Sequence, residues 1–185
     1  MSSKLEHKTT YYEDGSVKRE QWYQNGQLHR DGAPAEIAYF RKGSVYREEW
    51  CQQGRTHRTD GPARILYSRE GSLISESWYQ DGLRHRDGGP ARIDYHVNVG
   101  VWIEYWYQYG KLHREDGPAE TTYYTSGRVA CEAWYQNGEW HRDDGPAITW
   151  YNSDGSVESE KWFQDGVEVP QPQPPVKETS MGVEL

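Results

Sequence analysis

Histidine, arginine and glutamate recur together along this 185-residue chain, in a pattern that could do chemistry. Each histidine is followed directly by an arginine, and each follows a glutamate by nine residues. Imidazole is a common metal ligand and a general base near neutral pH. The pattern therefore raises two hypotheses, a metal or catalytic site used five times or a structural contact between repeated units. The histidines are His29, His57, His85, His113 and His141.

The metal hypothesis requires three or four ligands that converge on one point. Each unit supplies one histidine, and neighbouring histidines are expected about 9 to 10 Å apart if two strands separate them. That distance is too long for two histidines to bind one ion. The residue after the His-Arg pair also varies among Asp, Thr and Glu. We therefore predict no metal and no cofactor.

Catalysis requires an asymmetric group of residues that is used once, with a nucleophile, a base and an orienting group. Almost every reactive residue here is repeated, and the unrepeated Cys51, Cys131 and His96 are isolated in the pattern. Cys51 stands where other units carry tyrosine or phenylalanine, which indicates a packing position. We predict that the protein is not an enzyme.

A strict 28-residue repeat underlies the pattern and predicts the fold. Each unit contains two alternating segments, a first glycine turn, and a second turn such as Asn25-Gly26 that suits a tight hairpin. The prediction is an all-β protein, an elongated single-layer antiparallel sheet of tandem β-hairpins with residues 1–8 as a lead-in, six repeats over 9–169 and a Pro-rich tail over 170–185. An aromatic ladder is expected to pack it: Trp22, Trp50, Trp78, Trp106, Trp134, Trp162, Tyr39, Tyr67, Tyr95, Tyr123 and Tyr151.

The alternative to a chemical site is a staple, a charge-assisted ladder of hydrogen bonds between adjacent hairpins. The last unit has Val169 and Pro170 in place of His-Arg, as expected where no further unit follows. The sequence predicts this staple from Glu20, Glu48, Glu76, Glu104, Glu132, the five histidines, and Arg30, Arg58, Arg86, Arg114 and Arg142.

Composition limits the class of partner. The net charge of −8 argues against nucleic acid or an anionic membrane as the main partner. No apolar run approaches the roughly 20 residues of a membrane helix, and no signal peptide is visible. We expect a soluble intracellular protein.

The segment "EEWCQQGRTH" (Glu48 to His57) resembles the MORN repeat in its Glu-x-Trp, glycine and histidine spacing. It departs from that family where arginine follows the histidine, and the added "DGPA" bend is similar to MORN-like proteins of large DNA viruses such as the marseilleviruses. The resemblance implies a structural or protein-interaction scaffold, in the virion or the infected host cytoplasm. The alternative is an antitoxin-like regulatory binder from a bacterium or phage that blocks a protein partner.

Aromatic residues outside the regular ladder are the predicted contacts with a protein partner. They have no place in the repeat, and aromatic side chains are favoured at interfaces. An open sheet also has two edge strands that invite pairing with another chain. We therefore expect a homodimer through a sheet edge or the C-terminal tail. The predicted contact residues are Tyr12, Phe40, Trp102, Tyr124, Trp140 and Trp150.

Overall fold

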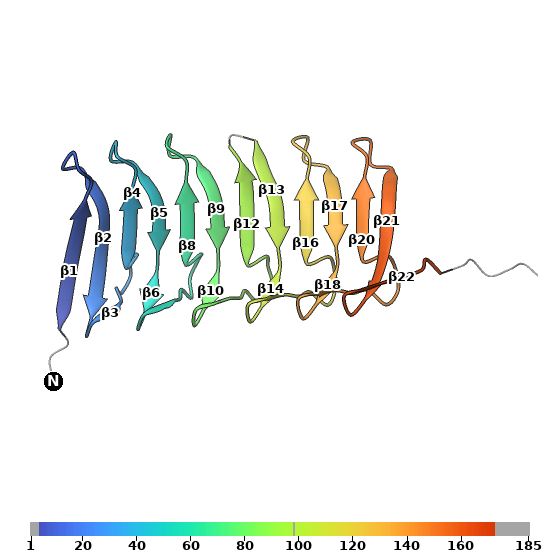
Figure 1. Ribbon diagram of the computed structural model, residues 1–185, viewed down its shortest axis with the longest axis horizontal. Helices are drawn as coiled ribbons and strands as arrows, with labels where there is room; N and C mark the ends of the chain where they lie inside the picture. Colours follow the sequence, from blue (N-terminus) through green and yellow to red (C-terminus); the bar gives the residue numbers. More distant parts are fainter. Residues whose placement is uncertain (1–3, 98, 173–185) are drawn as a thin grey trace, which may run out of the picture.

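The computed structural model describes residues 4–97 and 99–172, whose long strands form one elongated antiparallel sheet (Figure 1). Its long strands follow one another in chain order, and the sheet stays open, so the predicted fold class is confirmed. The long strands are β1 (Leu5–Tyr11), β2 (Val17–Gln24), β4 (Glu36–Tyr39), β5 (Val45–Glu49), β8 (Arg64–Tyr67), β9 (Leu73–Ser77), β12 (Arg92–His96), β13 (Gly100–Tyr105), β16 (Glu120–Tyr123), β17 (Val129–Ala133), β20 (Ile148–Tyr151) and β21 (Val157–Gln164).

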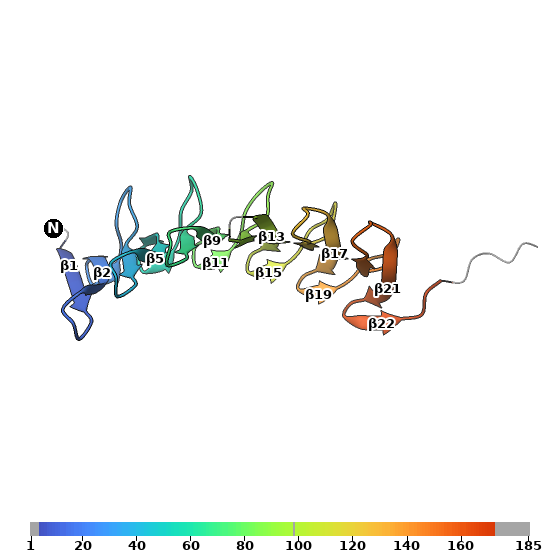
Figure 2. The same cartoon turned by 90° about the horizontal axis from the view of Figure 1, so that it is seen from above.

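A second set of short strands lies at the lower end of the long ones. Seen from above, β11, β15, β19 and β22 follow one another along one side of the rod (Figure 2). The short strands are β3 (Gln27–Leu28), β6 (Cys51–Gln52), β7 (Arg55–Thr56), β10 (Tyr79–Gln80), β11 (Leu83–Arg84), β14 (Tyr107–Gln108), β15 (Lys111–Leu112), β18 (Tyr135–Gln136), β19 (Glu139–Trp140) and β22 (Val167–Val169).

The two kinds of turn in each repeat differ in geometry. In the lower turns, both central residues have positive φ, as in Asn25 (51°) and Gly26 (80°), which is the two-residue hairpin turn that the sequence predicts. In the upper turns only the glycine does, as in Gly15 (82°), and the strand register shifts beside it, between Thr10 and Tyr11. The upper turns are therefore longer loops that end in a glycine bulge.

The tryptophan backbone joins the long hairpin to the short one. The N–H of Trp50 donates to the carbonyl of Ala63 at 2.7 Å, and its own carbonyl accepts from the N–H of His57 at 3.0 Å. The same two bonds recur at Trp22, Trp78, Trp106 and Trp134. The strand is interrupted between β5 and β6 at this residue, so the chain can leave the long sheet there.

Alanines, and not the aromatic residues, form the fully buried row of the molecule. The alanine that ends each "DGPA" bend has no exposed surface, whereas the described part of the chain contains no large side chain that is fully buried. The carbonyl of each alanine accepts from the N–H of the tryptophan, and a larger side chain at a position with no exposed surface would have to displace its neighbours. The sequence pattern predicts that the aromatic ladder packs the sheet and does not single out these alanines. The buried row is Ala35, Ala63, Ala91, Ala119 and Ala147.

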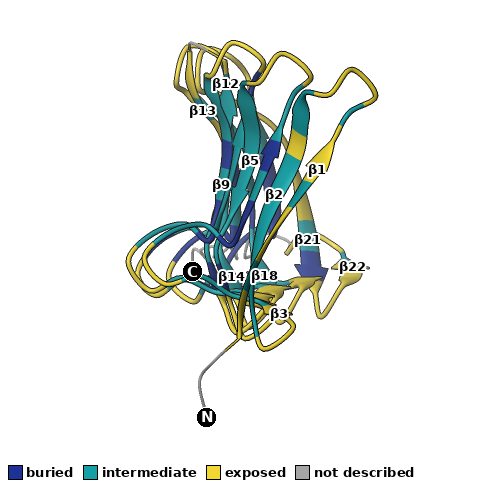
Figure 3. Ribbon diagram, turned by 90° about the vertical axis from the view of Figure 1, so that its left-hand side faces the viewer, coloured by how far each residue is buried: buried dark blue, intermediate teal, exposed yellow. Residues whose placement is uncertain are grey.

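Figure 3 looks along the rod and shows the buried residues midway along the long strands, with exposed residues at the loops. A cluster of buried apolar residues lies at the C-terminal end and contains Ala133, Ala147, Ile148 and Phe163. Within residues 4–97 and 99–172, no helix is long and apolar enough to cross a membrane.

The two ends of the sheet differ from the repeats between them. Strand β1 begins at Leu5, so the predicted lead-in already pairs with β2, Leu5 opposite Gln24 and His7 opposite Trp22. At the other end, β22 pairs with the lower part of β21 and ends at Val169. Most of the predicted tail, residues 173–185, lies outside the described residues.

Candidate functional site

The histidine row joins each repeat to the following one. In all five cases Nδ1 accepts a hydrogen bond, at 3.1 to 3.3 Å, from a backbone N–H 24 residues further along the chain. Nδ1 of His141 also lies 3.0 Å from Oδ1 of Asp165, and Nδ1 of His57 lies 3.6 Å from Oδ1 of Asp81. In four repeats Nε2 faces the acid two residues later, as His85 faces Asp87 at 3.2 Å. The backbone donors are Gln53, Asp81, Tyr109, Asn137 and Asp165.

The arginine row acts within each repeat. The guanidinium carbon of Arg114 lies 3.9 Å from the ring centre of Trp106, and the other four arginines lie 3.9 to 4.2 Å from their tryptophans. Such a contact stabilises both groups, by about 0.5 to 1 kcal/mol at an exposed site. Nε also donates to an aspartate in three repeats, as Arg114 does to Asp116 at 2.9 Å.

Glycine leaves room for this guanidinium beside its own backbone. A Cβ built on Gly117 would lie 2.7 Å from the guanidinium carbon of Arg114, closer than side-chain atoms approach one another. Gly61, Gly89 and Gly145 have the same relation to their arginines, at 2.8 to 3.1 Å. The arginine is therefore in close contact with both a tryptophan ring and a glycine.

The glutamate row binds tyrosine of the next repeat. The hydroxyl of Tyr39 donates to Glu20 Oε2 at 2.5 Å, and four further pairs have distances of 2.7 to 3.0 Å. Burial, this hydrogen bond and the negative charge raise the pKa of Tyr39 to about 12. The further pairs are Tyr67–Glu48, Tyr95–Glu76, Tyr123–Glu104 and Tyr151–Glu132.

The structure does not bring the predicted glutamate, histidine and arginine into one network. Glutamate binds a tyrosine and histidine binds a backbone N–H, both of the next repeat, while arginine stacks on its own tryptophan. Neighbouring residues of an extended chain point to opposite sides, which separates His85 from Arg86. Glutamate and histidine therefore do link adjacent hairpins as the staple predicts, whereas arginine does not, and three separate rows take the place of one ladder.

The first and last tryptophans have different surroundings from the others. Trp22 lies between Arg30 and His7, whose ring stacks on it with centroids 4.5 Å apart. Trp162 has no arginine over it among the described residues, because Pro170 takes that position. The ladder of tryptophans thus ends at each terminus in its own way.

Four of the six predicted partner contacts are committed to packing or hydrogen bonds within the chain. The hydroxyls of Tyr12 and Tyr124 donate to the carbonyls of Tyr39 and Tyr151, both at 2.7 Å. Trp150 packs on the C-terminal apolar cluster. Phe40 lies 5.4 Å from the ring of Tyr46.

The other two predicted contacts keep more of their surface exposed. Trp102 is 43% exposed, with the ring of His96 5.1 Å away. Trp140 is 38% exposed and lies between Tyr135 and Phe163, at 6.0 and 5.0 Å.

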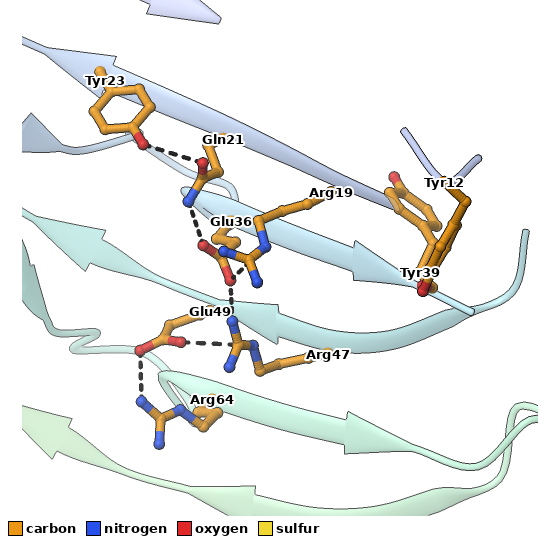
Figure 4. Close-up of polar contacts among 9 residues, drawn as sticks. All are labelled: Tyr12, Arg19, Gln21, Tyr23, Glu36, Tyr39, Arg47, Glu49 and Arg64. Carbon is orange, nitrogen blue, oxygen red and sulfur yellow. Dashed lines mark hydrogen bonds and ion pairs between the residues drawn. The ribbon is translucent and has the colours of Figure 1, made fainter. Parts of the chain in front are cut away.

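Sequence reasoning missed a partly buried chain of charges on the sheet face opposite the Glu–Tyr row (Figure 4). Gln21 donates to Glu36, which also binds Arg47, and Arg64 donates to Glu49 at 2.7 Å. Burial opposes ionisation of Glu49, but hydrogen bonds from Arg64 and Thr56 lower its pKa. The residue type changes at these repeat positions, from Gln21 to Glu49 and from Glu36 to Arg64, so the repeat gave no signal for them.

Two cysteines offer no reactive thiolate. Both are free, and burial raises the pKa of Cys51 and of Cys131 to about 11. In the described part of the chain, no three His, Cys, Asp or Glu side chains are grouped so that they could hold a metal ion.

A cavity of about 560 Å³ lies between the upper loops of the first three hairpins. Tyr12, Phe40, Arg41, Lys42 and Arg69 line it, together with Ser44 and Glu70. Of these, the sequence singled out Tyr12 and Phe40 but not the cations beside them.

Comparison of the chain with protein-family models and with curated proteins finds no match. The resemblance to MORN repeats therefore stays a prediction that rests on the motif alone.

Proposed function

We propose that the chain is a non-enzymatic scaffold of MORN-like repeats that binds proteins, a second copy of itself among them. The observation that supports this most is the open edge of β21. Residues Val157–Lys161 of this strand are all exposed, and only its lower part is covered by β22. An unpaired edge strand is a template for another strand.

Each end of the sheet carries one member of the Glu–Tyr row without its partner, a tyrosine at the N-terminal end and a glutamate at the C-terminal end. Glu160 and Tyr11 continue the two 28-residue series, yet neither side chain makes a hydrogen bond to another described residue. If β21 meets β1 of a second copy in the register of β2 and β4, Glu160 lies opposite Thr9 of that copy. Its neighbour Tyr11 can then donate to Glu160 as Tyr39 does to Glu20.

Two features make this contact weak. The same register places Lys161 opposite Lys8 of the second copy, and like charges opposite one another are destabilising. At the lower end, β22 pairs with β21, and residues Leu5–His7 pair with the equivalent part of β2. When two copies join in this register, β22 of one copy and Leu5–His7 of the other need the same space, so they cannot both stay paired. Pairing is then confined to the upper half of the edge.

The setting of this scaffold belongs to the proposal as well. The repeat resemblance favours a large DNA virus as the source, with the protein in the virion or in the host cytoplasm. The chain would then be intracellular and soluble. The negative charge favours protein partners over nucleic acid or membranes.

Sedimentation velocity over a range of concentrations tests self-association. We expect weak, concentration-dependent association of the full chain that strengthens in Lys161→Glu, because glutamate would face Lys8. Glu160→Lys should weaken it, and removal of residues 170–185 should leave it unchanged if the edge and not the tail is used. A chain that stays monomeric in Lys161→Glu at every concentration would contradict the edge contact.

A further inference from the structure

The upper loops of the first three hairpins enclose a cationic pocket that the repeat architecture does not require. The loops follow β1, β4 and β8 and lie side by side at one end of the rod (Figure 1). The cavity between them, of about 560 Å³, is lined by Arg41, Lys42 and Arg69, with Glu70 as its one carboxylate. The matching loops of the last two repeats, "YTSG" (Tyr124 to Gly127) and "NSDG" (Asn152 to Gly155), have no cation at the positions of Arg41, Lys42 and Arg69, and the guanidinium of Arg128 donates to the Ser153 carbonyl.

These cations lack the ion pairs that half of the arginines of the chain have. Arg47, Arg64 and Arg92 each bind a carboxylate. In residues 4–97 and 99–172, no carboxylate oxygen lies within 4.0 Å of the charged groups of Arg41, Lys42, Arg69 or nearby Lys18. The carboxylate of Asp14 lies near Arg41 but is bound by the N–H and hydroxyl of Ser16.

Aromatic rings hold two of the pocket cations in place. Arg41 lies 5.4 Å from the ring centre of Tyr12, and Arg69 lies 5.7 Å from that of Phe40. Tyr12 is fixed in turn by its hydrogen bond to Tyr39, and the Ser44 hydroxyl ties the second loop to the third by donating to the carbonyl of Arg69. The charged groups are therefore positioned before any ligand arrives, which lowers the cost of binding.

The charge of the rest of the rod restricts the ligand to a short anion. Residues 1–70 carry 12 Lys and Arg against 10 Asp and Glu, whereas residues 71–185 carry 9 against 19. A membrane surface or a long nucleic acid would meet this acidic part and be repelled. A compact group with two negative charges would meet only the pocket.

Guanidinium groups favour phosphate and carboxylate oxygens, because their planar fork binds two oxygens at once. Lys18 and Arg41 already lie over the ring of Tyr12, so recognition here depends on charge more than on stacking of a ligand ring. Clusters of arginine and lysine are a recurrent way to bind phosphorylated or acidic peptide segments.

We propose that this pocket binds a segment of a protein partner that carries a phosphorylated side chain or adjacent acidic side chains. This rests on the proposed role as a protein-binding scaffold and gives the chemistry of one partner. The site is separate from the sheet edge, so the two can fail independently.

Fluorescence anisotropy with labelled peptides and the full chain tests the proposal. The probes are one short Gly/Ser peptide with a central phosphoserine, the same peptide with two glutamates in its place, and the neutral parent. We expect the phosphorylated or the acidic peptide to bind more tightly than the parent, and the stronger of the two identifies the source of the charge. Equal binding of all three would overturn the proposal.

Charge-matched variants locate the binding. Arg41→Gln with Arg69→Gln should weaken it by about tenfold or more, since each loses a charged hydrogen bond. Arg55→Gln with Lys111→Gln removes the same charge from exposed positions and should change it little. Equal losses in both pairs, or competition by anionic vesicles but not by inorganic phosphate, would contradict a peptide pocket. Thermal melting confirms that each variant is folded, and unchanged sedimentation separates this result from the edge contact.

Discussion

The side chain of His85 contacts both the backbone N–H and the ring of Tyr109. Nδ1 of His85 accepts from the N–H of Tyr109 at 3.3 Å, and the two rings stack with centroids 4.6 Å apart. Tyr109 has a φ of 48°, a conformation that tyrosine rarely adopts. The histidine binds the backbone, so the same contact serves turns that carry Gln53 or Asn137 instead.

Replacing His85 with alanine should remove this link at the middle of the rod. The side chain is 8% exposed, and the Tyr109 N–H would lose its acceptor. We expect the free energy of unfolding to fall by about 1 to 3 kcal/mol, measured by urea denaturation. His96→Ala is the control, because His96 is outside the row. Equal losses at the two positions would show that the row has no special role.

The regular features of this fold could be predicted because each repeat meets the same neighbours. The spacing of Asn25-Gly26 and its equivalents predicted the lower turns, and the alternating segments predicted the long strands. In such a sheet every unit has to fit the next, so the sequence repeats whatever the joint requires.

Side-chain partners were harder to predict, because they depend on where separate elements meet. Arg86 follows His85 directly, but it lies over Trp78, while His85 binds the next repeat. The buried alanines recur as strictly as the tryptophans, yet their small size concealed their role. The Glu36–Arg47 pair follows no period, and only the paired register of β4 and β5 brings it together.

Gly117→Ala should displace Arg114 from Trp106. The new Cβ would overlap the guanidinium, which can move away only by giving up the ring and Asp116. We expect a loss of about 1 kcal/mol in the free energy of unfolding, close to the value of an exposed cation–π contact.

A double-mutant cycle with Arg114→Ala separates this effect from backbone strain. If the alanine at position 117 acts through Arg114, the double variant should be about as stable as Arg114→Ala alone. Additive losses would mean that the glycine is needed for its own backbone instead.

The Glu–Tyr row predicts a loss of stability in alkali. Burial, the hydrogen bond to Glu48 and the charge of that carboxylate raise the pKa of Tyr67 to about 12, against about 10 in an unfolded chain. The stabilisation is complete below about pH 10 and is lost as the pH rises towards 12, because the unfolded state releases the proton more readily. Urea denaturation between pH 8 and 12 measures this fall.

Tyr67→Phe should make that fall in stability shallower, since the chain then has one fewer tyrosine with a raised pKa. Tyr11→Phe is the matched control, because Tyr11 belongs to the same series but is 59% exposed and makes no side-chain hydrogen bond to another described residue. If both variants keep the slope of the unchanged chain, the row does not set the alkaline limit.

Residues 4–7 occupy the place that a preceding repeat takes elsewhere in the sheet. Their removal should expose an end of the sheet that can pair with a second copy. The Lys4 carbonyl accepts from the N–H of Asn25 at 2.9 Å. In every later repeat the equivalent N–H donates to a histidine Nδ1 instead. His7 covers Trp22 on the same side. Without these residues, β22 of a second copy could be seated beside β2.

Deletion of residues 2–7 should therefore increase self-association in sedimentation velocity, above the level of the full chain at equal concentration. Lys4→Ala is the control, because it keeps the backbone carbonyl and strand β1 and should sediment like the full chain. Adding Glu160→Lys to the deletion should reverse much of the increase if the new contact uses β21 beside β22. A deleted chain that stays folded and sediments as the full chain does would mean that residues 4–7 only lengthen a strand.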